Sequence, residues 1–228
     1  MSSKIVVVDA ILFDMDGTLI DSTPGVYKAW ETFASDYSLG DFREVAHATH
    51  GRRLYDTLKE LCKIQEEEQL QTEIDRFENE VILGGPMPLP GAKELIQNLN
   101  SLDGAKWTIV TSASNKYAPR ALEKAGIPVP KSGLITANDV AKGKPHPDPY
   151  LAGAEKCLVN PSNCLVVEDA ISGLLSGRSA GARTLAVCTS TQRSILENEA
   201  KPDYIVTDLT SVSVKLVEKK LQVTINDV

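Results

Sequence analysis

The sequence has few of the features that mark secreted, zinc-thiolate or membrane-spanning proteins. It contains four cysteines in 228 residues, and no two of them form a Cys-x-x-Cys pair. Neither a disulfide framework nor a zinc site is therefore predicted. No apolar run approaches the roughly 18 residues of a membrane helix, and the apolar stretch near the N-terminus is too short for a secretory signal. We therefore expect a cytoplasmic protein without a membrane partner.

Positive charge is also scarce. The 24 lysines and arginines are outnumbered by 31 aspartates and glutamates, which leaves a net charge of -7. An acidic surface of this kind disfavours nucleic acids and anionic membranes as partners. The sequence also lacks repeats and low-complexity segments, and its length allows one large domain or a core with a smaller companion. Any site for phosphate must therefore be locally positive within an acidic protein.

Strand and helix patterns alternate along most of the chain. Short apolar runs predict strands at 10–13, 107–111, 134–136, 164–167, 184–187 and 204–206. Helical patterns follow at 92–102, 116–125, 148–158, 170–180, 192–199 and 212–220, whereas 221–228 shows no clear pattern. Alternation of this kind predicts an α/β fold in which right-handed crossovers join the strands of a parallel sheet.

A helical insertion interrupts this alternation after the first strand. Residues 23–83 contain no strand-like run, and helical patterns occupy 24–36, 54–61 and 66–80. A stretch rich in glycine and proline, Gly84 to Gly91, then marks a boundary. We therefore expect a discontinuous core formed by 1–20 and 86–228, with 21–85 as a small all-helical unit inserted into it.

Two carboxylates end the first predicted strand. Asp14 and Asp16 follow the apolar run Ala10-Ile-Leu-Phe, and Gly17 and Thr18 come next. Carboxylates this close repel each other unless a cation separates them or one stays protonated. The carboxyl end of a strand in a parallel sheet is also where such folds place their chemistry. A functional site is one interpretation, and a strand followed by an ordinary Asp-Gly turn is the other.

Three further polar motifs follow later strands. Ser112 stands at the end of one strand, where a hydroxyl and the next backbone N–H groups can hold a phosphate oxygen, although Ser114 is equally suited to cap a helix. Lys144 lies in a loop between a glycine and a proline. Glu168 and Asp169 end another apolar run, where Asp169 could also cap the following helix. Together, the four motifs predict a phosphoryl-transfer site.

The order and spacing of the four motifs resemble those of the haloacid dehalogenase-like hydrolases over essentially the whole chain. The match is closest to the subgroup with a small helical cap between the first and second motifs, which implies a Rossmann-like core. Within that subgroup, His50-Gly-Arg-Arg53, Ile135-Thr-Ala-Asn-Asp-Val140 and Gly143-Lys-Pro-His-Pro147 are similar to fungal glycerol phosphate and 2-deoxyglucose 6-phosphate phosphatases.

The resemblance implies a catalytic role for each motif. Asp14 would attack phosphorus and form an aspartyl-phosphate, which divides one difficult displacement into two. Asp16 would protonate the leaving alkoxide and then deprotonate water. Lys144 and Ser112 would stabilise the transferring phosphoryl oxygens, and we expect Lys144 to bridge Asp14 and Glu168 in the resting site.

The resemblance also implies magnesium as the cofactor. The carboxylates of Asp14 and Asp169 and the backbone carbonyl of Asp16 would hold the ion, since hard oxygen ligands suit Mg²⁺. Glu168 would be either an outer ligand of the metal or a hydrogen-bond acceptor behind it. The expected function is the magnesium-dependent hydrolysis of a small sugar or polyol phosphate.

Substrate contacts are expected from both parts of the chain. The core would contribute Thr18, Ser112, Ala113 and Lys144, and the cap would contribute His50, Gly51, Arg52 and Arg53. Arg52 and Arg53 could equally be surface charges, and His47 and His146 are expected to be structural. The only predicted partner is a small-molecule phosphate ester, and a monomer is favoured over an oligomer.

Two other functions stay open at this point. A sugar-phosphate mutase of the same superfamily would return the phosphate to a sugar, but Leu54 stands where such mutases typically carry a phosphate-binding arginine. A non-catalytic regulatory homologue is the second alternative, and it is disfavoured because every catalytic position is intact.

Overall fold

A six-stranded parallel sheet forms the centre of the computed structural model, which describes residues 3–226. Every pair of neighbouring strands in this sheet is parallel. The strand order is β6 (Leu134–Ile135), β5 (Trp107–Val110), β2 (Ala10–Phe13), β7 (Cys164–Glu168), β8 (Arg183–Val187) and β9 (Tyr204–Val206). The predicted α/β class and its parallel sheet are confirmed.

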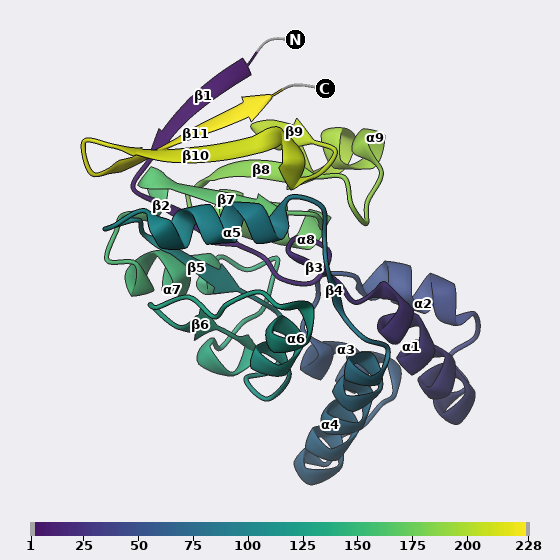
Figure 1. Cartoon of the computed structure of the whole chain (residues 1–228). Helices are drawn as coiled ribbons and strands as arrows, with labels where there is room; N and C mark the ends of the chain where they lie inside the picture. The colour runs from purple at the N-terminus through teal and green to yellow at the C-terminus, as the bar shows by residue number, and fades with distance from the viewer. Residues whose placement is uncertain (1–2, 227–228) are drawn as a thin grey trace.

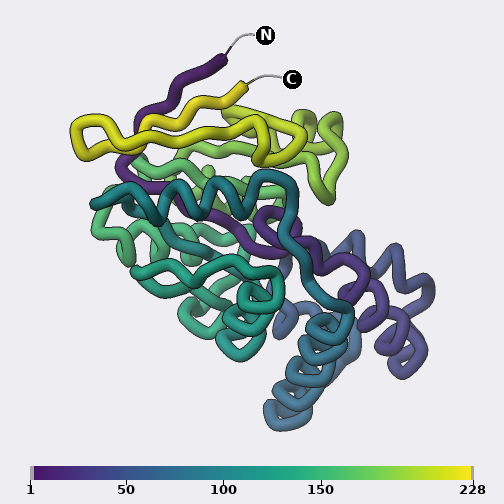
Figure 2. The backbone as a smooth tube through the Cα atoms, in the orientation of Figure 1, coloured from purple at the N-terminus to yellow at the C-terminus, as the bar shows by residue number. Residues whose placement is uncertain are grey.

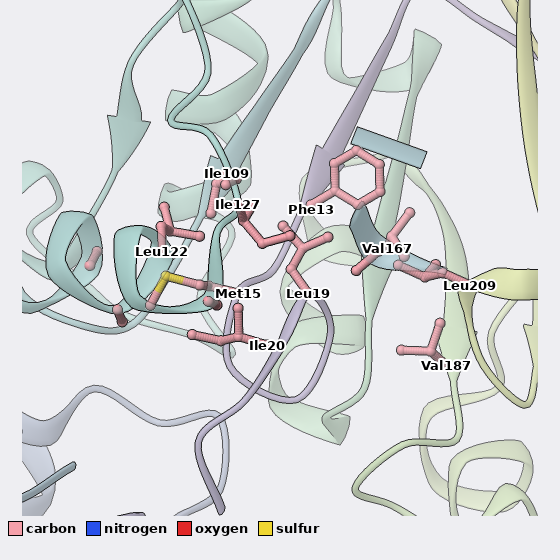
Figure 3. Packing of buried hydrophobic residues seen from close by; sticks show 14 of the residues in the cluster. Phe13, Met15, Leu19, Ile20, Ile109, Leu122, Ile127, Val167, Val187 and Leu209 are labelled. Carbon is pink, nitrogen blue, oxygen red and sulfur yellow. The ribbon is translucent and has the colours of Figure 1, made fainter. Parts of the chain in front are cut away.

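Helices cover both faces of this sheet (Figure 1). Residues on alternate positions of each strand point to opposite faces, so Phe13 and Val167 pack on one side and Leu12 and Val166 on the other. Figure 3 shows the first of these cores, where Phe13 lies among residues of several strands and of a helix. Because both faces are buried, the strands are continuous apolar runs. The helices involved are α5 (Ala92–Ser101), α6 (Tyr117–Ala125), α7 (Asp148–Lys156), α8 (Ile171–Ser179) and the short α9 (Arg193–Ile195).

The predicted helix over 212–220 is wrong. This segment is strand β10 (Val212–Val217), which pairs antiparallel with β11 (Lys220–Asn226), and β11 in turn pairs with β1 (Ser3–Val8). Val212 and Val214 are buried and Leu216 is half-buried, whereas Ser213, Lys215 and Val217 are exposed, which is the two-residue period of a strand. The 221–228 segment has the same alternation as far as Asn226. Figure 1 places this second, three-stranded sheet at the top of the molecule.

Four helices gather beyond the sheet at one end of the molecule (Figure 1), and we call them the cap helices. They are α1 (Thr23–Tyr37), α2 (Phe42–Thr49), α3 (Leu54–Leu61) and α4 (Glu67–Leu83). Trp30 and Phe33 of α1 pack edge-on against Phe77 of α4, with ring centroids 4.9 and 5.2 Å from its ring. The sequence did not predict α2, because only Ala46 and Thr49 of its eight residues are buried.

The chain leaves the sheet and returns to it at neighbouring points (Figure 2). Strand β3 (Ile20–Asp21) leads into the cap helices, and strand β4 (Met87–Pro88) leads out of them. The two strands pair antiparallel, with Ile20 opposite Pro88. This two-stranded connection is therefore a common base for all four cap helices. None of the helices within residues 3–226 has both the length and the hydropathy that crossing a membrane requires.

Candidate active site

The carboxyl ends of β2, β5 and β7 meet at one edge of the sheet. Strand β2 lies between β5 and β7, so Asp14 is placed between Ser112 on one side and Asp169 on the other. Lys144 reaches the same edge from the loop before α7. Its Nζ lies 2.6 Å from Asp14 Oδ1 and 2.7 Å from Glu168 Oε1, and it also donates to the Val110 carbonyl at 3.1 Å. The expected bridge between Asp14 and Glu168 is present.

Lys144 and its two carboxylates are buried. Burial opposes the charged form of Lys144, but the negative charges of Asp14 and Glu168 raise its pKa above the usual range. Burial, together with the negative charge of Glu168, raises the pKa of Asp14 well above its usual range. A permanent cation is therefore fixed beside a carboxylate that has lost most of its contact with water.

Glu168 uses both of its oxygens to hold neighbouring groups. Besides Lys144, Oε1 accepts a hydrogen bond from the Tyr150 hydroxyl at 3.0 Å, and Oε2 accepts from the N–H groups of Asp169 and Ala170 at 2.9 and 3.0 Å. Gly173 leaves the space for this carboxylate, because a Cβ there would lie 1.6 Å from Glu168 Oε1. Of the two roles left open for Glu168, this geometry favours the hydrogen-bond acceptor.

Asp169 faces the site and does not cap a helix. The N-cap of α8 is Ala170, whereas Asp169 Oδ1 accepts from the Thr18 hydroxyl at 3.0 Å. Its Oδ2 lies 2.7 Å from His50 Nε2 and also accepts a hydrogen bond from Ser190. Burial works against a charged imidazole, yet Asp169 raises the pKa of His50 to about 9. His50 and Asp169 therefore form an ion pair at neutral pH.

The buried carboxylates at this edge fit a divalent cation. Oxygen atoms of Asp14, Glu168 and Asp169 lie within 4.8 Å of one another. Carboxylate oxygens are the ligands that Mg²⁺ prefers, and three acidic groups packed this closely favour the binding of positive charge. Glu168 accepts four hydrogen bonds, which fill its acceptor positions. Asp169 accepts three and Asp14 accepts one, so these two carboxylates are the better candidates to bind the ion directly.

Asp16 is half-buried at the same edge, and burial raises its pKa. Its Oδ1 accepts a hydrogen bond of 2.9 Å from the hydroxyl of Tyr117, in the first turn of α6. A carboxyl with a raised pKa that is held in one orientation suits a group that must give and then take a proton.

Both possible roles of the second motif occur, on different residues. The Ser112 hydroxyl stands at the site and donates to the Gly51 carbonyl of the cap segment at 3.0 Å. The Ser114 hydroxyl instead precedes α6, whose N-cap is Lys116, and it accepts from the N–H groups of Lys116 and Tyr117 at 3.3 and 3.1 Å. Between them, the N–H of Ala113 donates to the Thr111 hydroxyl at 3.1 Å. Ser112 is thus the hydroxyl at the site, and its single O–H must turn away from the Gly51 carbonyl to donate to a phosphate oxygen.

The segment from His50 to Arg53 contacts the core, but its two arginines point to different places. Arg52 lines the cavity between the cap helices and the sheet, and it forms an ion pair with Glu60. Arg53 binds Asp56 through two hydrogen bonds of 2.8 Å and donates to the Val140 carbonyl at 3.3 Å. The structure therefore places Arg52 at the cavity and Arg53 in a contact between the cap and the core.

The cavity has a volume of about 410 Å³ and opens between the carboxyl edge of the sheet and the cap helices. Asp14, Asp16, Ser112 and Ala113 form part of its core side. The cap helices add apolar side chains and hydroxyl groups, with His47, His50, Gly51, Arg52 and Glu78 among the other lining residues. A small phosphate ester can therefore reach Asp14 while its other end contacts the cap.

A family comparison agrees with this geometry. The family model described as haloacid dehalogenase-like hydrolase matches residues 8–181. The chain belongs to this family. The resemblance carried by the four motifs is confirmed, and so is the prediction of a hydrolase.

Individual relatives of this hydrolase match over most of their length. Hexitol phosphatase A of Escherichia coli (strain K12) is 40% identical over 178 residues, which cover 77% of this chain and 81% of that protein. Glycerol-1-phosphate phosphohydrolase 2 of Saccharomyces cerevisiae is 34% identical, with 91% and 85% covered. The solved structure named putative beta-phosphoglucomutase from Bacteroides vulgatus superposes with a TM-score of 0.76 at 27% identity, with 89% of this chain and 84% of that chain covered.

Several side chains of this hydrolase site were missed from the sequence. Ser190 follows strand β8, next to β7 in the sheet, within a run of three hydroxyl residues that begins at Thr189. A search for polar residues after every predicted strand would have found it. Tyr117, Tyr150 and Glu78 lie within helices, where no local pattern distinguishes a side chain that faces a site from one that faces a core.

Proposed function

We propose that this hydrolase is a magnesium-dependent phosphatase that acts on a small sugar or polyol phosphate. The observation that carries the proposal is the buried arrangement of Asp14, Lys144 and Glu168, with Asp16 beside it at the mouth of a cavity. The relatives named as hexitol and glycerol-1-phosphate phosphatases support the same chemistry.

The proposed reaction has two steps that use the same residues. A carboxylate oxygen of Asp14 attacks phosphorus, the bond from phosphorus to the alcohol oxygen breaks, and Asp16 gives its proton to that oxygen. Asp16 then takes a proton from water, whose oxygen attacks the aspartyl-phosphate and releases phosphate from Asp14. Tyr117 keeps Asp16 oriented through the 2.9 Å hydrogen bond, and Lys144 supplies a fixed positive charge in both steps.

The residues that would hold magnesium are the carboxylates of Asp14 and Asp169, with the backbone carbonyl of Asp16. When bound, the ion supplies the charge that reduces repulsion between the Asp14 carboxylate and the phosphate dianion. Thr18 positions Asp169 by donating to its Oδ1, and the close approach of Gly17 leaves no room for a larger residue, since a Cβ there would lie 2.1 Å from Asp169 Oδ2.

In this proposal, residues of the inserted unit 21–85 select the substrate. Ser112 and Lys144 act on the phosphoryl oxygens, while His50, Gly51 and Arg52 lie where the rest of the ester would be. Residues 21–85 would move as a lid on the paired strands β3 and β4, and closure would exclude water from the phosphate.

Phosphate release from a panel of sugar and polyol phosphates tests the proposed function. We expect turnover that requires magnesium, stops with EDTA and also occurs with p-nitrophenyl phosphate. Absence of turnover on every ester would contradict the proposal and favour a regulatory homologue.

The mutase alternative has one observation in its favour, namely the superposition on a putative beta-phosphoglucomutase. A mutase would return the phosphoryl group of a labelled sugar phosphate to a sugar, whereas a phosphatase would release the labelled group as inorganic phosphate.

The molecular mass in solution, measured on the same preparation, tests the expected monomer.

A further inference from the structure

Glu78 lines the cavity, yet the reaction proposed above gives it no role. It belongs to α4 of the cap and is buried, with 6% of its surface exposed. Its Oε1 accepts a hydrogen bond of 2.9 Å from the backbone N–H of Ser114, and its Oε2 is bonded to the Ser114 hydroxyl. Burying a carboxylate costs free energy unless hydrogen bonds and an opposite charge compensate for its lost contact with water. The two hydrogen bonds fix its position but provide no opposite charge.

Glu78 lies on the side of the cavity where the alcohol part of the substrate must leave. Ser114, which holds Glu78, accepts a hydrogen bond from the N–H of Tyr117, and the hydroxyl of Tyr117 donates to Asp16. Because Asp16 is the group that protonates the leaving oxygen, the alcohol leaves next to Asp16. Asp16 and Glu78 also line the same cavity, and burial and, after it, the negative charge of Asp16 raise the pKa of Glu78. Glu78 therefore borders the space where the non-phosphate end of the ester begins.

The other charges on the cavity wall do little to offset the negative charge of Glu78. The positive charges of Arg52 and His50 on the cavity wall are each already in an ion pair, with Glu60 and with Asp169. A second anionic group on the substrate would therefore meet the carboxylate of Glu78 with little compensation. A substrate hydroxyl could instead donate a hydrogen bond to Glu78, because a carboxylate has about four acceptor positions and Ser114 occupies two of them.

On the basis of the proposed function, we propose that Glu78 is a specificity-determining residue for the alcohol end of the substrate. Its carboxylate accepts hydrogen bonds from the hydroxyl groups of an uncharged polyol or sugar. The same negative charge repels a carboxylate or a second phosphate at that end of the ester, since selectivity can come from repulsion of the wrong partner as well as from attraction of the right one. The preferred substrates are then monophosphates whose remaining groups are neutral.

Two esters that differ in one group make a direct test. Glycerol 1-phosphate ends in a CH₂OH group where 3-phosphoglycerate has a carboxylate. We expect the wild-type protein, assayed with saturating magnesium, to prefer glycerol 1-phosphate in kcat/KM. Glu78→Gln keeps the side-chain length and an acceptor for the Ser114 N–H, and it should reduce this preference by about tenfold or more. Burial raises the pKa of Glu78 to about 7, so an assay at about pH 8 keeps the wild-type group ionised.

Two further variants separate charge from structure. Glu80→Gln removes the same charge from the same helix, at a side chain that accepts from Thr32 and does not line the cavity, so the preference should not change. Glu78→Asp keeps the charge on a shorter side chain, and it should keep more of the preference than Glu78→Gln does. Melting temperatures of all variants show whether the fold is retained.

The outcomes distinguish this inference from the function on which it rests. An unchanged preference in Glu78→Gln would overturn the role of Glu78, and so would a parallel loss on both esters, which would mean that Glu78 only holds the Ser114 turn. A wild-type protein that prefers 3-phosphoglycerate would overturn it as well. A wild-type protein that hydrolyses neither these esters nor any other phosphate would overturn the proposed function and this inference together.

Discussion

The two sides of the cavity differ in how firmly their side chains are held. On the core side, Asp14, Lys144 and Glu168 are buried and joined by charged hydrogen bonds of 2.6 and 2.7 Å. On the cap side, 32% of the Arg52 side chain is exposed, and so is 55% of its partner Glu60. Buried, charged hydrogen bonds fix a geometry, whereas exposed ion pairs contribute little to it.

This difference suggests that the core side performs the chemistry and that the cap side selects the substrate. The steps that every phosphate ester shares require groups whose positions do not depend on the substrate, and the core side provides them. Selection among substrates requires groups that can differ between relatives while the chemistry is kept, and the cap side suits that role. Substitutions on the core side should therefore affect all substrates equally, and substitutions on the cap side should affect them unequally.

The largest expected effect is that of Asp14→Asn. An amide is a poor nucleophile, and the change also removes an anionic ligand for magnesium, so we expect kcat to fall by about 10³-fold or more. The loss should be equal for sugar phosphates, polyol phosphates and p-nitrophenyl phosphate. Asp103→Asn, at an exposed residue, is the matched control and should change nothing. Retention of a tenth of the wild-type activity would rule out the proposed role of Asp14.

Asp169→Asn should have a smaller effect that depends on the metal. The magnesium concentration for half-maximal activity should rise by about tenfold, since an amide oxygen is a weaker ligand for a hard cation than a carboxylate. Excess magnesium should then restore part of the rate on every substrate. A magnesium titration of activity, together with isothermal calorimetry, measures this. An unchanged magnesium requirement at full activity would remove Asp169 from the metal site.

Arg52→Ala tests the cap side directly. We expect kcat/KM for the best polyol or sugar phosphate to fall by about 30- to 150-fold, which corresponds to the loss of a charged contact of roughly 2–3 kcal/mol. Hydrolysis of p-nitrophenyl phosphate should change only a few-fold, because that ester has no hydroxyl groups to bind. A parallel loss on both substrates would mean that Arg52 acts on phosphate or on folding, and the division between the two sides would fail.

The sequence predicted the core side of the site better than the cap side, and the reason is physical. An apolar run that ends in polar residues is a local signal, and parallel strands bring such ends to one edge without further information. That is how Asp14, Ser112 and Asp169 could be predicted. Tyr117 and Glu78 meet their partners across 101 and 36 residues of sequence, from positions inside helices. No local pattern encodes contacts of that kind.

In the fold as well, one part was predicted from the sequence better than another: the central sheet better than the three-stranded sheet. Strands buried on both faces are strong apolar runs, and all six strands of the central sheet could be placed from them. Strands β1, β10 and β11 form a smaller sheet in which buried and exposed residues alternate. In β10 that alternation runs for only six residues, and Glu218 and Lys219 follow it in the turn to β11. A short amphipathic segment with a charged end fits a helical pattern almost as well as a strand.

The smallest expected effect concerns Arg53, which lies beside Arg52 in sequence but not at the cavity. Its two hydrogen bonds to Asp56 and its contact with the Val140 carbonyl connect α3 of the cap to a loop of the core. Because 43% of the Asp56 side chain is exposed, solvent weakens this ion pair, and we expect Arg53→Ala to lower the free energy of unfolding by about 1 kcal/mol. Its effect on kcat/KM should be a few-fold and equal for all substrates.

Arg53→Ala and Arg52→Ala together make the sharpest comparison of the two neighbouring arginines. Both variants remove the same side chain, so a difference between them reflects position alone. Chemical denaturation should show the larger change for Arg53→Ala, and the ratio of polyol phosphate to p-nitrophenyl phosphate turnover should change only for Arg52→Ala. If Arg53→Ala altered that ratio, the cap would select substrates by how it rests on the core near Val140 as well as by the residues that line the cavity.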